Sequence, residues 1–182
     1  GEETWRVTTN GKEKTYAVTS AVEAKPGVVI KTTGTVVQEA GLAPKEASLE
    51  VDVGGEKVSV KLGKEKGILT LRTKHGADPE EVVAEKEPSD IIPLNPINVG
   101  ASVLCQDAAW KKSSYVAFPG APLKVLSRRD VKDETGKTLG RMVVLDQGAG
   151  DRIEVGCEGE MLAVLRQPFQ GIDVIRKGQN AF

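Results

Sequence analysis

The stretch Ala47–Gly63, "ASLEVDVGGEKVSVKLG", alternates apolar and polar side chains on both sides of a glycine pair. The apolar positions are Leu49, Val51, Val53, Val58, Val60 and Leu62. The polar positions between them are Glu50, Asp52, Lys57, Ser59 and Lys61. Because successive side chains of a β-strand point to opposite faces, this pattern predicts two antiparallel strands with one apolar and one charged face. Gly54-Gly55 is the predicted turn, since tight hairpin turns need residues that tolerate positive φ.

The rest of the first half repeats this alternation. The apolar positions of the further predicted strands are Trp5 and Val7, then Tyr16, Val18 and Val22, then Val28, Ile30 and Val36, and finally Leu69 and Leu71. Asn10-Gly11 predicts a tight hairpin turn between the first two strands. The first half is therefore expected to be an antiparallel meander with one apolar face and one solvated face.

The second half is also typical of strands, but its pattern differs. Met142–Leu145, "MVVL", and Met161–Leu165, "MLAVL", are apolar at successive positions, as expected where both faces of a sheet are covered. Only Asp78–Glu87, "DPEEVVAEKE", has a helix-like start, with Pro79 in its first turn and Pro88 after its end. We therefore predict a mainly β chain. Its fold is a large curled antiparallel sheet, or half-barrel, with an apolar proline-containing crossover and at most one or two short helices.

The crossover is Ser89–Gln106, "SDIIPLNPINVGASVLCQ", which carries one charge, Asp90, in a chain with 28% charged residues. Two prolines disfavour a central strand, so we expect this segment to cover the concave apolar face of the meander. This organisation predicts a single domain, 1–182, with a meander half (1–88), the covering crossover (89–106) and a second strand set (107–182). Two small, tightly joined halves are the alternative.

An apolar ligand in the concavity would contact residues of the wall and of the cover. The predicted ligand-binding residues are Val18, Ile30, Val51, Val58, Val60 and Leu62 in the wall, and Ile91, Ile92, Leu94 and Ile97 in the cover. The alternative for these residues is a filled core without a cavity.

Composition and motifs argue against several other functions. A net charge of −1 and interleaved lysines and acids argue against nucleic-acid binding, and no apolar stretch is long enough for a transmembrane segment.

His75, the one histidine, lies beside a glycine with no nucleophile motif, so no catalytic residue is predicted. Asp146–Asp151, "DQGAGD", is more typical of a tight turn than of a calcium loop, so we expect no metal and no cofactor. Trp110, Tyr115 and Phe118 are expected in the core or rim of the second half.

The order of these features resembles a known group of folds. A long antiparallel meander, a proline-containing apolar crossover, further strands and a final hairpin, "LRQPFQGIDVIRK" at Leu165–Lys177, are similar to the unclosed β-barrel proteins. That group includes periplasmic lipoprotein carriers of LolA/LolB type and related exported bacterial lipid-binding proteins. The resemblance implies an open half-barrel whose apolar concavity takes up acyl chains. The chain departs from the group because it lacks a convincing pair of helices to form a lid.

Cys105 and Cys157 are the two cysteines of the chain, too few for a typical metal site. We predict that they form a disulfide that pins the crossover to the second-half strands; two buried thiols are the alternative. A disulfide, together with a chain that begins abruptly at Gly1, predicts an exported protein, periplasmic or extracellular, whose leader has been removed. The predicted function is non-enzymatic binding or shielding of an apolar ligand, a lipid or an acyl chain. The alternative is a cell-envelope structural or protein-interaction module with a filled core and no ligand.

Overall fold

The computed structural model describes residues 1–38, 44–86, 91–93, 98–106, 110–118, 121–168 and 172–177. The first strands are β1 (Glu2–Asn10), β2 (Glu13–Lys25), β3 (Val28–Gln38), β4 (Pro44–Val53), β5 (Glu56–Glu65), β6 (Ile68–His75) and β7 (Glu81–Lys86). They are followed by β8 (Ile91–Pro93), the 3-10 helix η1 (Asn98–Cys105), β9 (Ser114–Phe118), β10 (Ala121–Lys132), β11 (Thr138–Gly148), β12 (Asp151–Glu158), β13 (Met161–Gln167) and β14 (Ile172–Ile175). The predicted mainly β, antiparallel fold class is confirmed.

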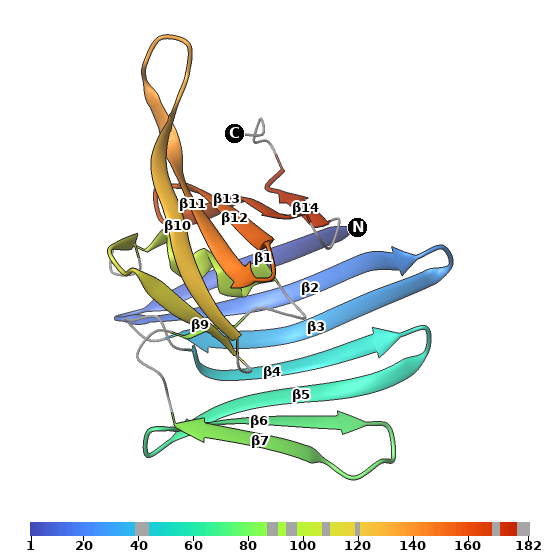
Figure 1. Ribbon diagram of the computed structural model, residues 1–182. Coiled ribbons are helices and arrows are strands. Elements are labelled where there is room, and N and C mark those ends of the chain that lie inside the picture. Colours follow the sequence, from blue (N-terminus) through green and yellow to red (C-terminus); the bar gives the residue numbers. More distant parts are fainter. Residues whose placement is uncertain are drawn as a thin grey trace. The chain divides into compact units, whose positions relative to one another are not determined.

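The strands form two seven-stranded sheets, each with its strands in chain order (Figure 1). The first runs from β1 to β7 and the second from β8 to β14, and in the described part of the chain neither is closed by pairing between its two end strands. The chain divides into two compact units that correspond to these sheets, and the first sheet ends at Lys86, close to the predicted end of the meander half. The large sheet that the sequence predicts is thus divided into two open sheets, because no ladder among the described residues joins β7 to β8.

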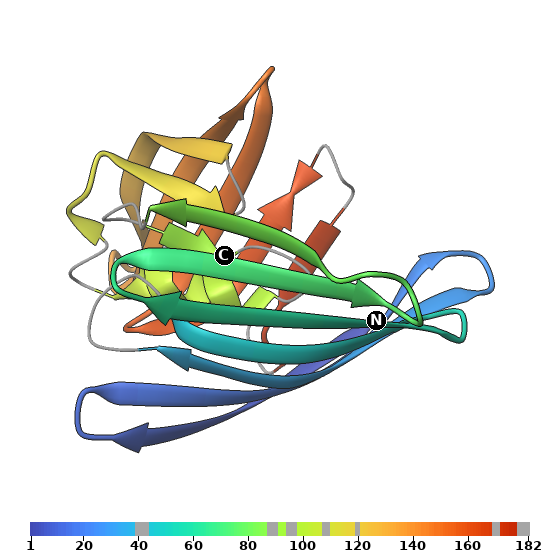
Figure 2. The same ribbon diagram turned by 90° about the horizontal axis from the view of Figure 1, so that it is seen from below.

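The first sheet is a continuous twisted ladder, seen from blue to green in Figure 2. The β4–β5 hairpin confirms the predicted pairing of apolar positions: Leu49 lies opposite Val60, and Val51 opposite Val58. Gly54 and Gly55 form the turn with φ of 62° and 98°, values that side chains with a Cβ rarely adopt.

The β1–β2 turn lies one residue further along than the sequence predicted. Asn10 pairs with Glu13, so the turn residues are Gly11 and Lys12, and Gly11 has a φ of 60°. Asn10 thus belongs to the strand, and a glycine at the first turn position supplies the positive φ that the hairpin needs.

The helix predicted over Asp78–Glu87 is wrong. Glu81–Lys86 forms strand β7, which pairs antiparallel with β6 and places Val82 opposite Arg72 and Val83 opposite Leu71. Adjacent β-branched valines favour a strand, and the edge of β6 offers hydrogen-bond partners for their backbone.

The second sheet has a dense core in its central strands. Its buried apolar residues there are Met142, Val143, Leu145, Ile153, Val155, Leu162, Ala163, Val164 and Leu165. Met142 and Val143 are neighbours on opposite faces of β11 and both are buried, which confirms that both faces of these strands are covered. Part of that cover is η1, which contacts β12 and β13. Among the described residues, no helix has the length and apolar character that crossing a membrane requires.

Candidate functional site

The first sheet has one apolar face, which we call the inner face. Residues directly opposite each other across a ladder share a face, so the pairings define rows that cross the sheet. The central row consists of Trp5, Val18, Gly34, Leu49, Val60, Thr73 and, at the β7 edge, Glu81. The row on one side of it consists of Val7, Tyr16, Val36, Ala47, Leu62, Leu71 and Val83. The row on the other side consists of Glu3, Ser20, Thr32, Val51, Val58 and His75.

The opposite, outer face carries the charges. One of its rows places Asp52 between Lys31 and Lys57, and another places Lys61 opposite Arg72. The polarity of the two faces is the one that the alternating sequence predicts for the β4–β5 hairpin, whose apolar positions all lie on the inner side. Val37 on β3 and Val82 on β7 are apolar residues of the outer face.

Burial on the inner face is greatest in the middle of the sheet and lower on the edge strands and at the ends of the inner strands, where Val53 on β4 exposes 37% of its surface. Val18 and Leu49, on β2 and β4, expose 2% and 4% of their surface. Val7 on edge strand β1 and Val83 on edge strand β7 expose 50% and 41%. The inner face therefore combines a buried apolar centre with apolar side chains that still contact water at both edges.

All of the wall residues predicted to bind a ligand lie on this face. The buried ones are Val18, Val51 and Leu62, and the half-buried ones are Ile30, Val58 and Val60. The ladder places Val51 beside Val58 and connects Val18 to Val60 through Gly34 and Leu49. Their role in binding stays a prediction.

The predicted cover is divided between two elements. Ile91 and Ile92 belong to β8, which pairs in parallel with β9 in the second sheet, and their side chains lie outside the described part of the structure. Leu94 and Ile97 also lie outside the described residues. The part of the crossover that forms η1 contacts strands of the second sheet. Ligand contact by these four residues stays a prediction.

Sequence reasoning missed the glycine at the centre of the inner face. Gly34 has a φ of 155°, and a Cβ added to it would lie 2.1 Å from the carbonyl oxygen of Ser48 and 3.0 Å from Cδ2 of Leu49. The backbone of β4 thus approaches β3 more closely here than a side chain allows. An isolated glycine within an alternating stretch was the available signal, since it often marks such an approach.

The inner face also holds buried polar groups. Ser20 and Thr32 expose 5% and 1% of their surface, and Oγ1 of Thr32 has no hydrogen-bond partner among the described residues. A hydroxyl without a partner is costly in an apolar setting, so this position is a local weakness of the central strands.

The described residues give little support for a catalytic site, a metal site or a pocket for a polar ligand. His75 is exposed at the end of β6, and no group of three or more described His, Cys, Asp or Glu side chains could hold a metal. In the "DQGAGD" turn, the carboxylate of Asp146 accepts a hydrogen bond from the backbone N of Gly148 at 2.9 Å, as turn aspartates commonly do. A hollow of about 390 Å³ beside β5 and β6 has a mixed charged lining that includes Lys61, Glu65 and Arg72. Such a lining is typical of a hydrated surface.

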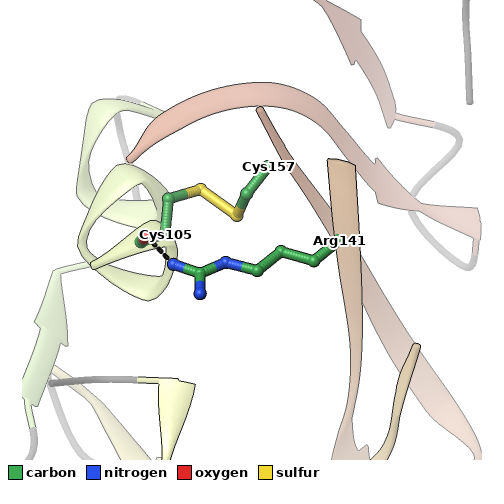
Figure 3. Close-up of a disulfide and its surroundings, with 3 residues drawn as sticks. All are labelled: Cys105, Arg141 and Cys157. Carbon is green, nitrogen blue, oxygen red and sulfur yellow. Dashed lines mark hydrogen bonds between the residues drawn. A yellow bond between two sulfur atoms is a disulfide. The ribbon is translucent and has the colours of Figure 1, made fainter. Parts of the chain in front are cut away.

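The second unit contains the disulfide between Cys105 and Cys157, with Cα atoms 5.4 Å apart (Figure 3). It joins the last residue of η1 to β12, and both cysteines are fully buried. Tyr115 of the predicted aromatic cluster is buried in the same unit, Trp110 is half-buried, and the side chain of Phe118 is outside the described part.

Comparisons with known proteins agree with this architecture. A crystal structure of a β-barrel-like protein of domain of unknown function DUF1849 from Brucella abortus is similar to this chain, with a TM-score of 0.50 and 12% sequence identity. The similarity covers 90% of this chain and 80% of the other. At this identity it shows a shared β-barrel-like fold. No protein-family model matches the sequence, and no curated protein matches it.

Proposed function

We propose that this protein is a non-enzymatic, exported bacterial protein that binds an apolar ligand, a lipid or acyl chain, on the inner face of its first sheet. The observation that carries the proposal is the graded burial of that face. Val18 and Val51 are buried, whereas Val58 and Val60 on β5 are only half-buried. Apolar surface that still contacts water can be covered by a ligand, with a gain of about 25 cal/mol for each Å² removed from water.

Two further observations support export and a carrier-like role. A disulfide persists in oxidising compartments, and the bond between Cys105 and Cys157 fits a periplasmic or extracellular protein. The β-barrel-like fold shared with the Brucella abortus protein is compatible with the resemblance to LolA/LolB-type carriers. An open sheet with one apolar face is the feature that such carriers use to hold acyl chains.

Native mass spectrometry of the purified protein and titration with a fluorescent fatty acid test this function. We expect a co-purifying lipid mass and saturable binding of the probe. Val60→Trp should weaken probe binding at least tenfold, because the indole would occupy apolar surface at the centre of the inner face. Ser59→Trp is the matched control, since Ser59 is the neighbouring residue on the outer face and should leave binding unchanged.

Urea denaturation of the same variants separates a binding face from a filled core. A face with room for a ligand accepts the indole, so the unliganded Val60→Trp protein should keep its free energy of unfolding. A filled core would instead lose about 1–3 kcal/mol on overpacking. Loss of stability together with the absence of any bound lipid or probe would contradict the proposal.

A protein-interaction module is the second candidate, and edge strand β7 favours it. Val82 and Val83 lie on opposite faces of this strand and expose 50% and 41% of their surface. Strand β7 pairs on one side only among the described residues, and such an edge can accept a strand from a partner protein. Light scattering after size exclusion should then show association that Val82→Lys abolishes, while a strictly monomeric wild-type protein would count against this candidate.

A further inference from the structure

Two arginines on neighbouring strands of the second sheet converge on one tryptophan. Arg128 on β10 lies opposite Val143, and Arg141 lies two residues from Val143 on β11, so both arginines are on the same face. The guanidinium carbons of Arg141 and Arg128 are 4.5 and 5.9 Å from the ring centre of Trp110. Both distances are within the range of cation–π contacts. The fold thus holds two permanent positive charges beside one ring.

Arg128 is held in place by neutral groups. Its Nη2 donates to the carbonyl oxygen of Lys112 and, at 3.4 Å, to the hydroxyl of the buried Tyr115. Among the described residues, no carboxylate forms an ion pair with Arg128, and its Nε is buried without a hydrogen-bond partner. A positioned guanidinium without a carboxylate partner among the described residues is suited to bind an anion, which would supply the countercharge.

The neighbouring sequence adds to the positive charge. Trp110 is followed directly by Lys111 and Lys112, whereas one acid, Asp107, precedes it by three residues. The one acidic residue opposite the arginines in the β10–β11 ladder is Asp130, the cross-strand partner of Arg141. This excess of cations is local, because the chain as a whole has a net charge of −1.

The cations also cannot easily move apart. Arg141 donates to the carbonyl oxygen of Cys105 at 2.5 Å, and Cys105 is bonded to Cys157, which is the partner of Arg141 on β12. The disulfide therefore fixes the group that orients Arg141 (Figure 3). Holding like charges together costs free energy, and preorganised arginines are the usual means of binding phosphate and carboxylate groups.

We propose that Trp110, Arg128 and Arg141 form a binding site for an oxyanion, a phosphate or carboxylate group. The proposal is independent of the apolar-ligand function, because it concerns another unit of the chain and another type of ligand. The oxyanion can come from a free metabolite or from a lipid headgroup, and the experiment distinguishes the two sources.

The test is calorimetric titration with inorganic phosphate and with acetate at constant ionic strength, using chloride as the reference salt. In parallel, the protein is sedimented with vesicles of phosphatidylglycerol and of phosphatidylcholine. Saturable binding of either small anion supports a free oxyanion. Binding only to phosphatidylglycerol vesicles supports a headgroup as the source. No binding to any of the anionic probes overturns the proposal.

Arg128→Gln should weaken whichever binding is found at least tenfold. The matched control is Arg129→Gln, which removes the same charge from the next residue, on the opposite face of β10, where Arg129 donates to Sδ of Met142. Equal effects of the two variants would overturn the proposal, since they would reflect net charge alone.

If the Arg128→Gln protein does not fold, the same binding experiment is made with Lys111→Glu. Lys111 is exposed, so its replacement leaves the packing intact. Binding of the oxyanion should then fall at least threefold relative to the wild-type protein. Unchanged binding in a folded Lys111→Glu protein would overturn the proposal.

Discussion

The guanidinium of Arg141 donates a hydrogen bond to the carbonyl oxygen of Cys105, 2.5 Å away, and Cys105 is joined to Cys157, the residue opposite Arg141 on β12. A covalent bond and a hydrogen bond thus fix the end of η1 to two adjacent strands (Figure 3). Both cysteines are fully buried, so the bond forms part of the packed core of the second unit. This arrangement makes the stability of that unit dependent on the oxidation state of the pair.

Reduction of the disulfide is expected to lower the free energy of unfolding substantially. The bond joins residues 52 positions apart, and closing a loop of that size constrains the unfolded chain by about 4 kcal/mol in the chain-entropy model. Urea denaturation with and without a reductant measures the difference. The Cys105→Ser/Cys157→Ser double variant should be as unstable as the reduced protein and should not respond to reductant. Equal stability of the oxidised and fully reduced wild-type protein would contradict this expectation.

The tip of the β10–β11 hairpin provides a pH-dependent prediction. The carboxylate of Asp133 accepts hydrogen bonds from the hydroxyl of Thr135 at 2.6 Å and from the backbone N of Thr135 and Lys137 at 2.9 and 3.0 Å. The Thr135 hydroxyl, followed by the backbone donors, holds the pKa of Asp133 below its ordinary value of 3.8. Because the folded pKa is depressed, the stabilisation is present above pH 3.8 and is lost as the pH falls through the folded pKa.

Thr135→Ala is therefore expected to raise the pKa of Asp133 toward 3.8. The carboxyl chemical shift of Asp133, followed by nuclear magnetic resonance between neutral and acidic pH, reports this value directly. Thr138→Ala, in the strand that follows the turn, serves as the control and should leave the titration unchanged. A titration that is the same in the wild-type and Thr135→Ala proteins would show that the hydroxyl does not stabilise the carboxylate.

Strict alternation allowed the first sheet to be predicted from sequence. In Ala47–Gly63 the period of the side chains and the burial of the residues agree, so the pairing of Val51 with Val58 followed from the turn position alone. Asp78–Glu87 was predicted wrongly because proline and acidic residues signal a helix start locally. The strand that forms there is stabilised by hydrogen bonds to β6. The residues of Asp78–Glu87 alone do not show that β6 lies beside them.

The sequence allowed the inner face of the first sheet to be predicted, but not the pair of arginines in the second sheet. Alternation shows which residues of one strand share a face, and this was sufficient to place Val18 and Val60 on the same side of the sheet. Alternation does not show which residues of different strands lie opposite each other. The position of Gly34 between Val18 and Leu49 is therefore known only from the strand pairing in the structure. Arg128 and Arg141 lie on different strands in stretches that carry several other charges, and only the hairpin register brings them to one face.

Gly34 is expected to be sensitive to the addition of a single methyl group. A Cβ at this position would lie 2.1 Å from the carbonyl oxygen of Ser48, and backbone cannot move aside as a flexible side chain can. Gly34→Ala should therefore lower the free energy of unfolding by about 1–3 kcal/mol, the usual range for overpacking. Gly63→Ala is the matched control, because Gly63 is also in a strand, has no positive φ, and would bring an added Cβ within 4 Å of no described atom. It should leave stability unchanged or raise it by up to about 1 kcal/mol.

Thr32→Val is expected to stabilise the protein. Thr32 exposes 1% of its surface, and its Oγ1 has no hydrogen-bond partner among the described residues, so the hydroxyl has lost its hydration without compensation. Valine has nearly the same shape and favours strands, and it removes the unsatisfied group. We expect the free energy of unfolding to rise by about 1 kcal/mol in urea denaturation.

Thr33→Val is the matched control for this substitution, since Thr33 is the next residue of β3 and is exposed on the outer face. It should change stability by no more than about 0.5 kcal/mol. The difference between the two variants isolates the contribution of the buried hydroxyl from the strand propensity that both substitutions share. If Thr32→Val instead lowers stability by about 1 kcal/mol or more, the hydroxyl has a partner in solution, and the inner face is more polar at this position than an acyl chain would favour.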